Sequence, residues 1–493
     1  MATARDNGLI KALGLVDATT LVMGSMIGSG VFIVAADISR QVQSPGLLML
    51  TWFATAALTL VAALSYGELA AAMPHAGGQY VYLREAFGPL WGFLFGWTMF
   101  LVIQTGTIAA VAVAFAKYTG VFIPWISADN NLIRIGFGSN GAVTLLRVTT
   151  QQALAIALIV FLTWSNTRGI RTGAAVQNVF TFAKVAALLG LVGFGFLLGR
   201  NPAAVSANFT NFWRGASWSV DTVRLVGVAM VGALFSSDAW NNVTFTAGEM
   251  RNPRRNLPLS LALGVAIVSA LYIASNFVYL NVLTLHDIQT ADQDRVATAA
   301  AAMMFGRGVA AQLMAAAIMI STFGCDNGIV LSGARVYYAM AKDKLFFRRA
   351  GELDPVHHAP RFSLVAQCVW AVLLTLSGSY SNLLDYVIFA VLLFYMLTIA
   401  GLFVLRRTRP DMERPYKAFG YPVLPAAYIL VAGFIDVLLL IYKPGYAWPG
   451  LIIVLLGVPV YFVWNKKRTE AGDHRTTGSN GDAAAGGGGG SLG

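Results

Sequence analysis

A run of small residues interrupts the first long apolar stretch, residues 15–38, and its main-chain groups could bind charges. Its centre reads Gly24-Ser25-Met26-Ile27-Gly28-Ser29-Gly30. Glycine inside a helix costs up to about 1 kcal/mol relative to alanine, which favours an opening of the helix near Gly28 to Gly30. An opened helix offers free amides to an anion and free carbonyls to a cation, the two charges of an amino acid. Close packing of a neighbouring helix against small residues is the alternative.

A second polar run lies in the middle of another apolar stretch, residues 223–249. It reads Phe235-Ser236-Ser237-Asp238-Ala239-Trp240-Asn241. A carboxylate in the bilayer costs roughly 2.5–3.5 kcal/mol on insertion scales, so Asp238 is a candidate functional residue. Two roles stay open at this point. Asp238 could hold unwound backbone through local hydrogen bonds, or it could contact the ammonium group of a substrate.

The composition is that of a membrane protein. Of 493 residues, 57% are hydrophobic and only 12% are charged, whereas about 25% of the residues of a soluble protein are charged. The net charge is +11, but the basic residues gather in alternate loops, so we expect no nucleic-acid partner. Cys325 and Cys368 both lie in apolar runs, where a structural disulfide is not expected. The chain shows no metal-ligand cluster and no catalytic constellation, so we expect no metal, no cofactor and no enzymatic activity.

Apolar stretches predict an all-α polytopic membrane protein with twelve transmembrane helices. The stretches cover residues 15–38, 46–72, 88–118, 147–165, 174–199, 223–249, 257–284, 309–341, 362–378, 383–405, 422–442 and 447–464. An even number of spans places both termini on one side, and the basic loops mark that side as cytoplasmic. We therefore expect a multi-pass protein of the cell (inner or plasma) membrane, with residues 1–14 and 465–493 in the cytoplasm. The glycine-rich end of this tail is typical of a flexible linker.

The two interrupted stretches are the first and the sixth. Interruptions at corresponding positions of two halves are typical of transporters built from inverted repeats. This pairing predicts a five-plus-five fold with discontinuous helices 1 and 6. Residues 15–199 would form the first repeat, residues 223–406 the second, and residues 422–464 two further spans. The broken segment at residues 73–88 would be a connection rather than a span.

Four motifs resemble the amino acid–polyamine–organocation (APC) superfamily, and within it a prokaryotic-type member of the L-type amino acid transporter (LAT) branch. They lie at residues 28–32, 68–88, 177–184 and 238–258. The resemblance implies the LeuT-like five-plus-five fold and sodium-independent amino acid transport by alternating access. It favours exchange of neutral amino acids. A proton-coupled amino acid or polyamine symporter remains an alternative, as does an amino acid sensor that does not transport.

The resemblance also implies a set of binding residues. The backbone from Ile27 to Gly30 would hold the substrate carboxylate, and carbonyls near Phe235 and before the first break would take the ammonium group. The predicted substrate-binding residues are Ser25, Met26, Ile27, Gly28, Ser29, Gly30, Phe235, Ser236, Ser237, Asp238 and Asn241. Phe235 would also gate the extracellular side. Lys184 would stand in the place of the sodium ion of sodium-coupled relatives, either as a fixed structural cation or as a proton carrier.

The sequence departs from the L-type pattern at two places. The loop at residues 119–146 has no cysteine, so no disulfide-linked heavy chain is expected as a partner. Asp238 stands where many L-type members have a small residue, which keeps dibasic amino acids among the substrates. Span positions suggest four further pocket residues: Gln104, Asn327, Phe389 and Phe394. A charged cluster after the sixth span could latch the inner side or could simply follow the positive-inside rule; it consists of Glu249, Arg251, Arg254 and Arg255.

Overall fold

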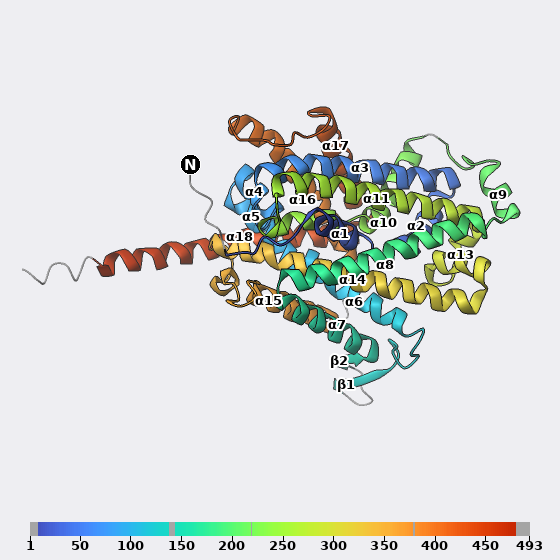
Figure 1. Ribbon diagram of the computed structural model, residues 1–493, viewed down its shortest axis with the longest axis horizontal. Coiled ribbons are helices and arrows are strands. Elements are labelled where there is room, and N and C mark those ends of the chain that lie inside the picture. Colours follow the sequence, from blue (N-terminus) through green and yellow to red (C-terminus); the bar gives the residue numbers. More distant parts are fainter. Residues whose placement is uncertain (1–7, 138–142, 218, 378–379, 480–493) are drawn as a thin grey trace, which may run out of the picture.

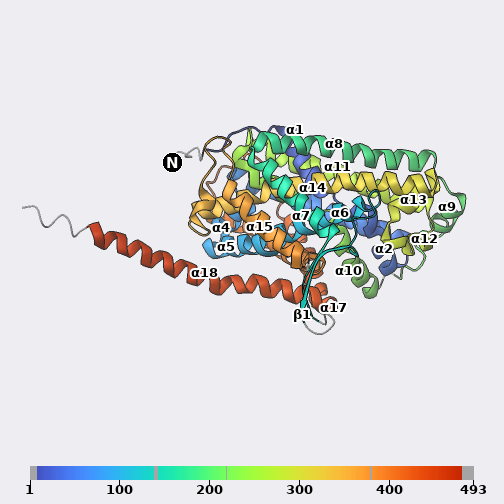
Figure 2. The same ribbon diagram turned by 90° about the horizontal axis from the view of Figure 1, so that it is seen from below.

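The protein folds as an elongated bundle of helices, seen from two sides in Figures 1 and 2. The computed structural model describes residues 8–137, 143–217, 219–377 and 380–479. The elements are α1 (Leu15–Met26), α2 (Gly30–Val42), α3 (Pro45–Ala72), α4 (Gln79–Phe87), α5 (Pro89–Thr98), η1 (Met99–Ile103), α6 (Gln104–Thr119), β1 (Asn131–Phe137), β2 (Val143–Thr149), α7 (Thr150–Thr167), α8 (Ile170–Leu197), α9 (Pro202–Phe209), α10 (Val220–Ser236), η2 (Trp240–Glu249), α11 (Pro253–Val282), α12 (Leu285–Gln289), η3 (Asp292–Asp294), α13 (Val296–Phe305), α14 (Arg307–Lys342), η4 (Arg348–Gly351), α15 (Arg361–Ser377), α16 (Tyr380–Thr408), α17 (Val423–Tyr442) and α18 (Pro444–Ser479).

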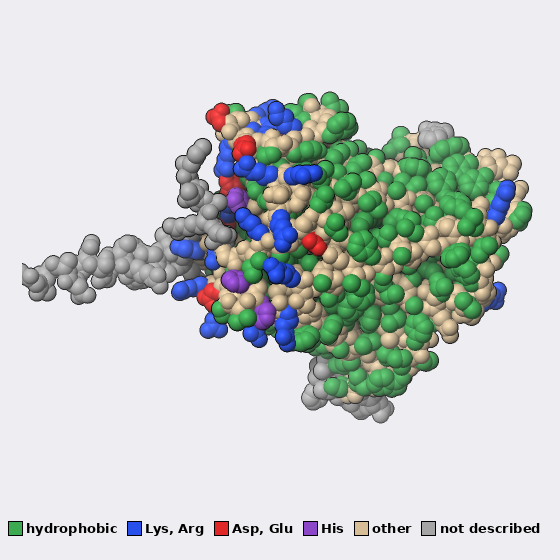
Figure 3. All heavy atoms as spheres, viewed as in Figure 1, with side chains coloured by type: hydrophobic (Ala, Val, Ile, Leu, Met, Phe, Trp, Pro, Cys, Tyr) green, Lys and Arg blue, Asp and Glu red, His purple; other side chains and the backbone are tan. Residues whose placement is uncertain are grey.

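The predicted polytopic membrane fold is confirmed. Within the described residues, nine helices are long and apolar enough to cross a membrane, and the bent pair α1 and α2 makes a tenth span. The two remaining expected spans are helices as well, α7 and α15. Exposed aromatic side chains such as Trp164, Phe182 and Phe194 lie along these helices, and hydrophobic atoms cover most of the face drawn in Figure 3. Such a surface suits a lipid environment.

Both predicted interruptions are present. α1 ends at Met26, α2 begins at Gly30, and the two helices are bent by 43° at the break. α10 ends at Ser236 and continues after three residues as the 3₁₀-helix η2. Within the second break Ala239 has a φ of +64°, a left-handed conformation that costs an L-residue about 1–2 kcal/mol. The chain is therefore forced out of helical geometry at both positions that the sequence pattern indicated.

Several elements were not predicted. The third span contains a π-helical turn, η1, between α5 and α6. The loop at residues 119–146 contains an antiparallel hairpin of β1 and β2, and the broken segment at residues 73–88 contains the short helix α4. The division into repeats at residues 199 and 223 stays a prediction. The predictions for residues 1–7 and for the glycine-rich end of the tail concern residues outside those that the structure describes.

Charged side chains gather at one end of the bundle, where α4 and α15 lie (left in Figures 1 and 3). We call this the α4 end. In α4, Glu85 forms ion pairs with Arg84 and Arg409. Burial alone would raise the pKa of the Glu85 carboxyl, but the hydrogen bonds from Arg409 and Arg84 outweigh it, so its pKa is lowered. Arg84 also pairs with Asp343, which joins α4 to the chain after α14.

Glu249 does not pair with the arginines that follow it, Arg251, Arg254 and Arg255, and a latch formed by this charged cluster stays a prediction. Glu249 is 1% exposed and pairs with Arg335 of α14, which is also 1% exposed, through contacts of 2.8 and 3.1 Å. The physical reason is that η2 carries Glu249 into the interior, whereas the three arginines that follow lie on the surface. Arg254 pairs instead with Glu413 at an exposed site.

Replacing Arg335 should destabilise the protein strongly. Arg335→Leu leaves the carboxylate of Glu249 buried without its partner, which typically costs about 3–5 kcal/mol. Arg254→Leu is the matched control, because its pair with Glu413 is exposed and such pairs contribute about 0–1 kcal/mol. Thermal unfolding of the detergent-solubilised protein measures the difference. The double variant Glu249→Leu/Arg335→Leu should recover part of the loss, and equal shifts for Arg335→Leu and Arg254→Leu would contradict this account.

Candidate functional site

Lys184 of α8 reaches the first break and binds its carbonyl groups. Its ammonium Nζ donates to the carbonyl oxygens of Gly24 at 2.6 Å, Ile27 at 2.8 Å and Ser321 at 3.2 Å. The side chain is 1% exposed. Oxygen ligands from the backbone are the ligands that a cation takes where a membrane helix is unwound. A tethered ammonium group thus fills a cation site built from carbonyl oxygens.

Side chains of neighbouring helices bind the other carbonyls of this break. The thiol of Cys325 donates to Ser25 at 3.1 Å, and the Tyr272 hydroxyl lies 3.0 Å from the carbonyl of Met26. The Ser321 hydroxyl lies 3.0 Å from the carbonyl of Ile27 and 2.8 Å from that of Gly28. Consequently five consecutive carbonyls accept side-chain hydrogen bonds, those of Gly24, Ser25, Met26, Ile27 and Gly28.

The amide side of the break is different. Gly30 begins α2, and the first amides of a helix have no partner within that helix. Ser29 precedes it as the N-cap residue and makes no side-chain cap to these amides. The positive end of the α2 dipole therefore lies beside amides that no N-cap side chain binds, an arrangement suited to an anion.

The two breaks are in direct contact. A Cβ atom on Gly30 would lie 2.2 Å from the Ser236 hydroxyl oxygen, so only glycine fits here. The Tyr272 hydroxyl lies 3.0 Å from the carbonyl of Ser236 and 3.0 Å from that of Met26, and thus bridges α10 to α1. Movement of one break must therefore displace the other.

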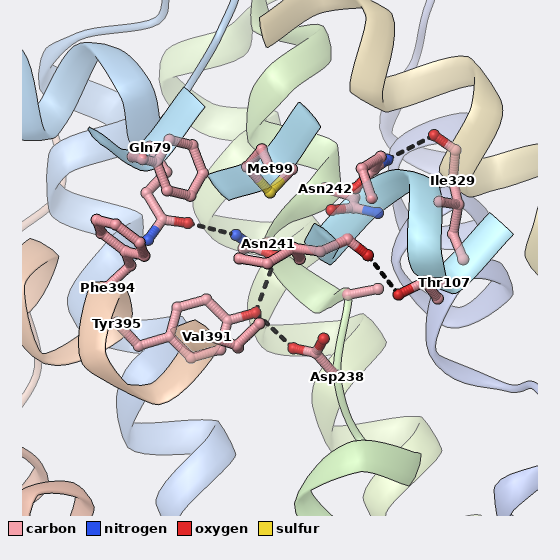
Figure 4. Close-up of a pocket in the computed structure, with 14 residues that line it drawn as sticks. Gln79, Met99, Thr107, Asp238, Asn241, Asn242, Ile329, Val391, Phe394 and Tyr395 are labelled. Carbon is pink, nitrogen blue, oxygen red and sulfur yellow. Dashed lines mark hydrogen bonds between the residues drawn. The ribbon is translucent and has the colours of Figure 1, made fainter. Parts of the chain in front are cut away.

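Asp238 in the second break is bound by a tyrosine. The Tyr395 hydroxyl of α16 lies 2.7 Å from the Asp238 carboxylate and 3.0 Å from the Asn241 side-chain oxygen. The Asn241 amide donates to Gln79 at 2.7 Å, and Gln79 donates to Thr398 at 3.1 Å. A chain of hydrogen bonds thus runs from the second break to the start of α4 (Figure 4).

A narrow cavity lies beside the second break (Figure 4). Its walls come from the second break and η2, from the π-helical turn, and from α4, α5, α6, α14 and α16. The lining residues are Gln79, Phe95, Met99, Ile103, Gln104, Thr107, Asp238, Ala239, Asn241, Asn242, Ile329, Val391, Phe394 and Tyr395. The lining mixes apolar side chains with a few convergent polar groups, as small-molecule sites usually do.

The cavity brings together only part of the predicted site. Of the predicted substrate-binding residues, Asp238 and Asn241 line it, and Ser237 and Asp238 line a second, smaller cavity. Eight others line neither cavity: Ser25, Met26, Ile27, Gly28, Ser29, Gly30, Phe235 and Ser236. Their binding roles, and the gate at half-buried Phe235, stay predictions.

The further pocket residues divide evenly. Gln104 and Phe394 line the cavity, whereas Phe389 does not. Asn327 instead donates to the Gln177 side chain at 3.0 Å and to the carbonyl of Gly173 at 3.1 Å, which ties α14 to α8. Sequence reasoning missed Tyr272, Ser321, Tyr395, Gln79 and Asn242. A hydroxyl or amide inside an apolar span was the available signal for all of them except Gln79, which lies in the broken segment at residues 73–88.

The site is suited to binding rather than to metal chemistry. Across the ranges that the structure describes, no group of three or more His, Cys, Asp or Glu side chains could hold a metal ion. The free amides of α2 can accept an anion. The carboxylate and the amide side chains of the cavity can accept polar or positively charged groups.

Comparison with known proteins places the chain among transporters. A family model described as "Amino acid permease" matches residues 13–463. The mouse b(0,+)-type amino acid transporter 1 is 30% identical over 469 residues, which covers 93% of this chain and 89% of that protein. The serine/threonine exchanger SteT of Bacillus subtilis is 30% identical, and the match covers 94% of this chain and 99% of that protein. The human large neutral amino acids transporter small subunit 2 is also 30% identical, and the match covers 93% of this chain and 82% of that protein.

These matches span nearly the whole bundle, including both broken helices and Lys184. The resemblance inferred from the four sequence motifs is thereby confirmed. The chain belongs to the amino acid permease family of the APC superfamily.

Proposed function

We propose that this protein is a sodium-independent exchanger of neutral L-amino acids that works by alternating access. The observation that carries the proposal is the carbonyl site at the first break, which the Lys184 ammonium already fills. A site with a permanent tethered cation has no need of a sodium ion. Three relatives named above are amino acid transporters or exchangers, which supports amino acids as the cargo.

The main chain of the substrate would bind between the two breaks. The first amides of α2 receive its carboxylate. Its ammonium group goes to the carbonyls near Phe235 and Ser237 of the second break. Phe235 closes the extracellular side. We infer obligate exchange because one of the relatives is named a serine/threonine exchanger.

Asp238 keeps dibasic amino acids among the candidate substrates, because its carboxylate lines the cavity. We propose that the α4 end faces the cytoplasm, since positively charged side chains gather there (Figure 3). The protein would then lie in the cell membrane with both termini inside. It would act without a disulfide-linked heavy chain, and it would catalyse no covalent reaction.

Reconstituted vesicles test the transport reaction. Proteoliposomes loaded with unlabelled leucine should take up labelled leucine much faster than vesicles without internal amino acid. Replacement of sodium by choline should leave that rate unchanged, because Lys184 takes the place of the ion. Uptake that needs no internal amino acid would contradict exchange, and uptake driven by a pH step would favour proton symport. Binding of leucine without any flux would identify a sensor.

Lys184→Met should abolish transport while keeping most of the side-chain volume. The variant leaves the carbonyls of Gly24, Ile27 and Ser321 without the ammonium donor, and each buried unsatisfied group costs about 1–3 kcal/mol. We expect leucine exchange to fall at least tenfold. Lys117→Met is the matched control, because Lys117 is an exposed lysine near the end of α6. Wild-type exchange by Lys184→Met in sodium-free buffer would refute the role proposed for the ammonium group.

A further inference from the structure

One polar side chain in the cavity has no hydrogen-bond partner. Asn242 belongs to the first turn of η2, lines the cavity and is only 3% exposed. Its side-chain nitrogen is buried without a partner, and none of the hydrogen bonds found among the described residues involves its side-chain oxygen.

The other polar groups of the cavity are engaged. The Asn241 amide donates to Gln79, and the Gln104 amide donates to the carbonyl of Ile329 at 2.6 Å. The Thr107 hydroxyl donates to the carbonyl of Ile103 at 2.5 Å, and the Asp238 carboxylate accepts from Tyr395. The unmet hydrogen-bonding capacity of the cavity is therefore concentrated at Asn242.

The backbone holds Asn242 in place. Its main-chain amide donates to the carbonyl of Ala239 at 3.2 Å, which ties the side chain to the left-handed residue of the second break. Thr107 of α6 and Ile329 of α14 lie near it in Figure 4, and Gln104 of α6 lines the same cavity. The carboxamide is thus close to the place where the main chain of the substrate is proposed to bind, on a side that a substrate side chain could enter.

We propose that Asn242 is a specificity-determining residue that hydrogen-bonds an uncharged polar side chain of the substrate, a hydroxyl or a carboxamide. This inference rests on the proposed function and adds the substrate class. A carboxamide both donates and accepts, so it suits groups that do the same. An apolar side chain in this cavity would leave the amide of Asn242 buried and unpaired, and such a loss is costly.

Asn242 and Asp238 favour different side chains. The Asn242 carboxamide carries no charge, so its hydrogen bonds favour serine, threonine, asparagine and glutamine. Any preference for lysine or arginine would have to come from the Asp238 carboxylate, which accepts one hydrogen bond from Tyr395.

Isosteric pairs of amino acids test this inference directly. Threonine and valine, or asparagine and leucine, compete with labelled alanine for exchange in proteoliposomes loaded with alanine. The wild-type protein should prefer the polar member of each pair by about tenfold or more, the ratio that one well-formed hydrogen bond provides. Asn242→Leu should remove or reverse this preference. Asn242→Gln, which keeps the carboxamide, should retain part of it.

Controls separate the role of Asn242 in specificity from the proposed transport function. Alanine has no group that reaches Asn242, so alanine exchange should persist in Asn242→Leu and report on insertion and folding. If Asn242→Leu does not exchange alanine, the smaller change Asn242→Ala should show the same loss of preference. Asn256→Leu, at the start of α11 and outside the cavity, controls for the substitution itself.

The outcomes decide between the proposals. Equal inhibition by the two members of each pair would overturn the inference, as would an unchanged ratio in Asn242→Leu or stronger inhibition by arginine than by any polar amino acid. Absence of exchange of every amino acid by the wild-type protein would instead refute the proposed function.

Discussion

The structure depends on one constraint, which is that carbonyl groups exposed by an opened helix must find donors inside an apolar bundle. Each buried carbonyl without a partner would cost about 1–3 kcal/mol. At the first break the donors come from three different helices: Lys184 from α8, Tyr272 from α11, and Ser321 with Cys325 from α14. These helices are fixed around α1 by that need. The break is therefore a shared feature of four helices rather than a local property of a glycine-rich sequence.

The donors make the two sides of the break unequal. Protein side chains occupy the carbonyls from Gly24 to Gly28, whereas the N-cap side chain of α2 binds none of its first amides. An anion can bind at these amides without displacing anything. A cation would have to compete with the Lys184 ammonium. The same asymmetry explains why a proposed zwitterion binds with its carboxylate at the first break and its ammonium group at the second, with Tyr272 between them.

Sequence reasoning found what is encoded locally. Runs of apolar residues predicted helices at all twelve expected spans, ten of which, among the described residues, are long and apolar enough to cross a membrane, and glycine or an acid inside a run predicted both breaks. The partners could not be found in this way, because they come from distant parts of the chain. Glu249 and Arg335 are 86 residues apart, and Ile27 and Ser321 are 294 residues apart. The sequence placed Glu249 beside three arginines, and only the turn of η2 into the interior explains why none of them is its partner.

Recognition of the substrate is divided between two kinds of group. Main-chain amides and carbonyls at the breaks suit the carboxylate and ammonium groups that all amino acids share. The packing that holds these main-chain groups tolerates little change, because Gly30 leaves no room for a Cβ beside Ser236. The cavity beside the second break is lined instead by side chains, among them Asn242, whose replacement leaves the backbone bond to Ala239 available. Substrate preference could therefore change at Asn242 without disturbing either break. Relatives that share the broken helices would be expected to differ in the residues of this cavity, since only there can a substitution alter the side chain that is accepted and keep the shared main-chain site.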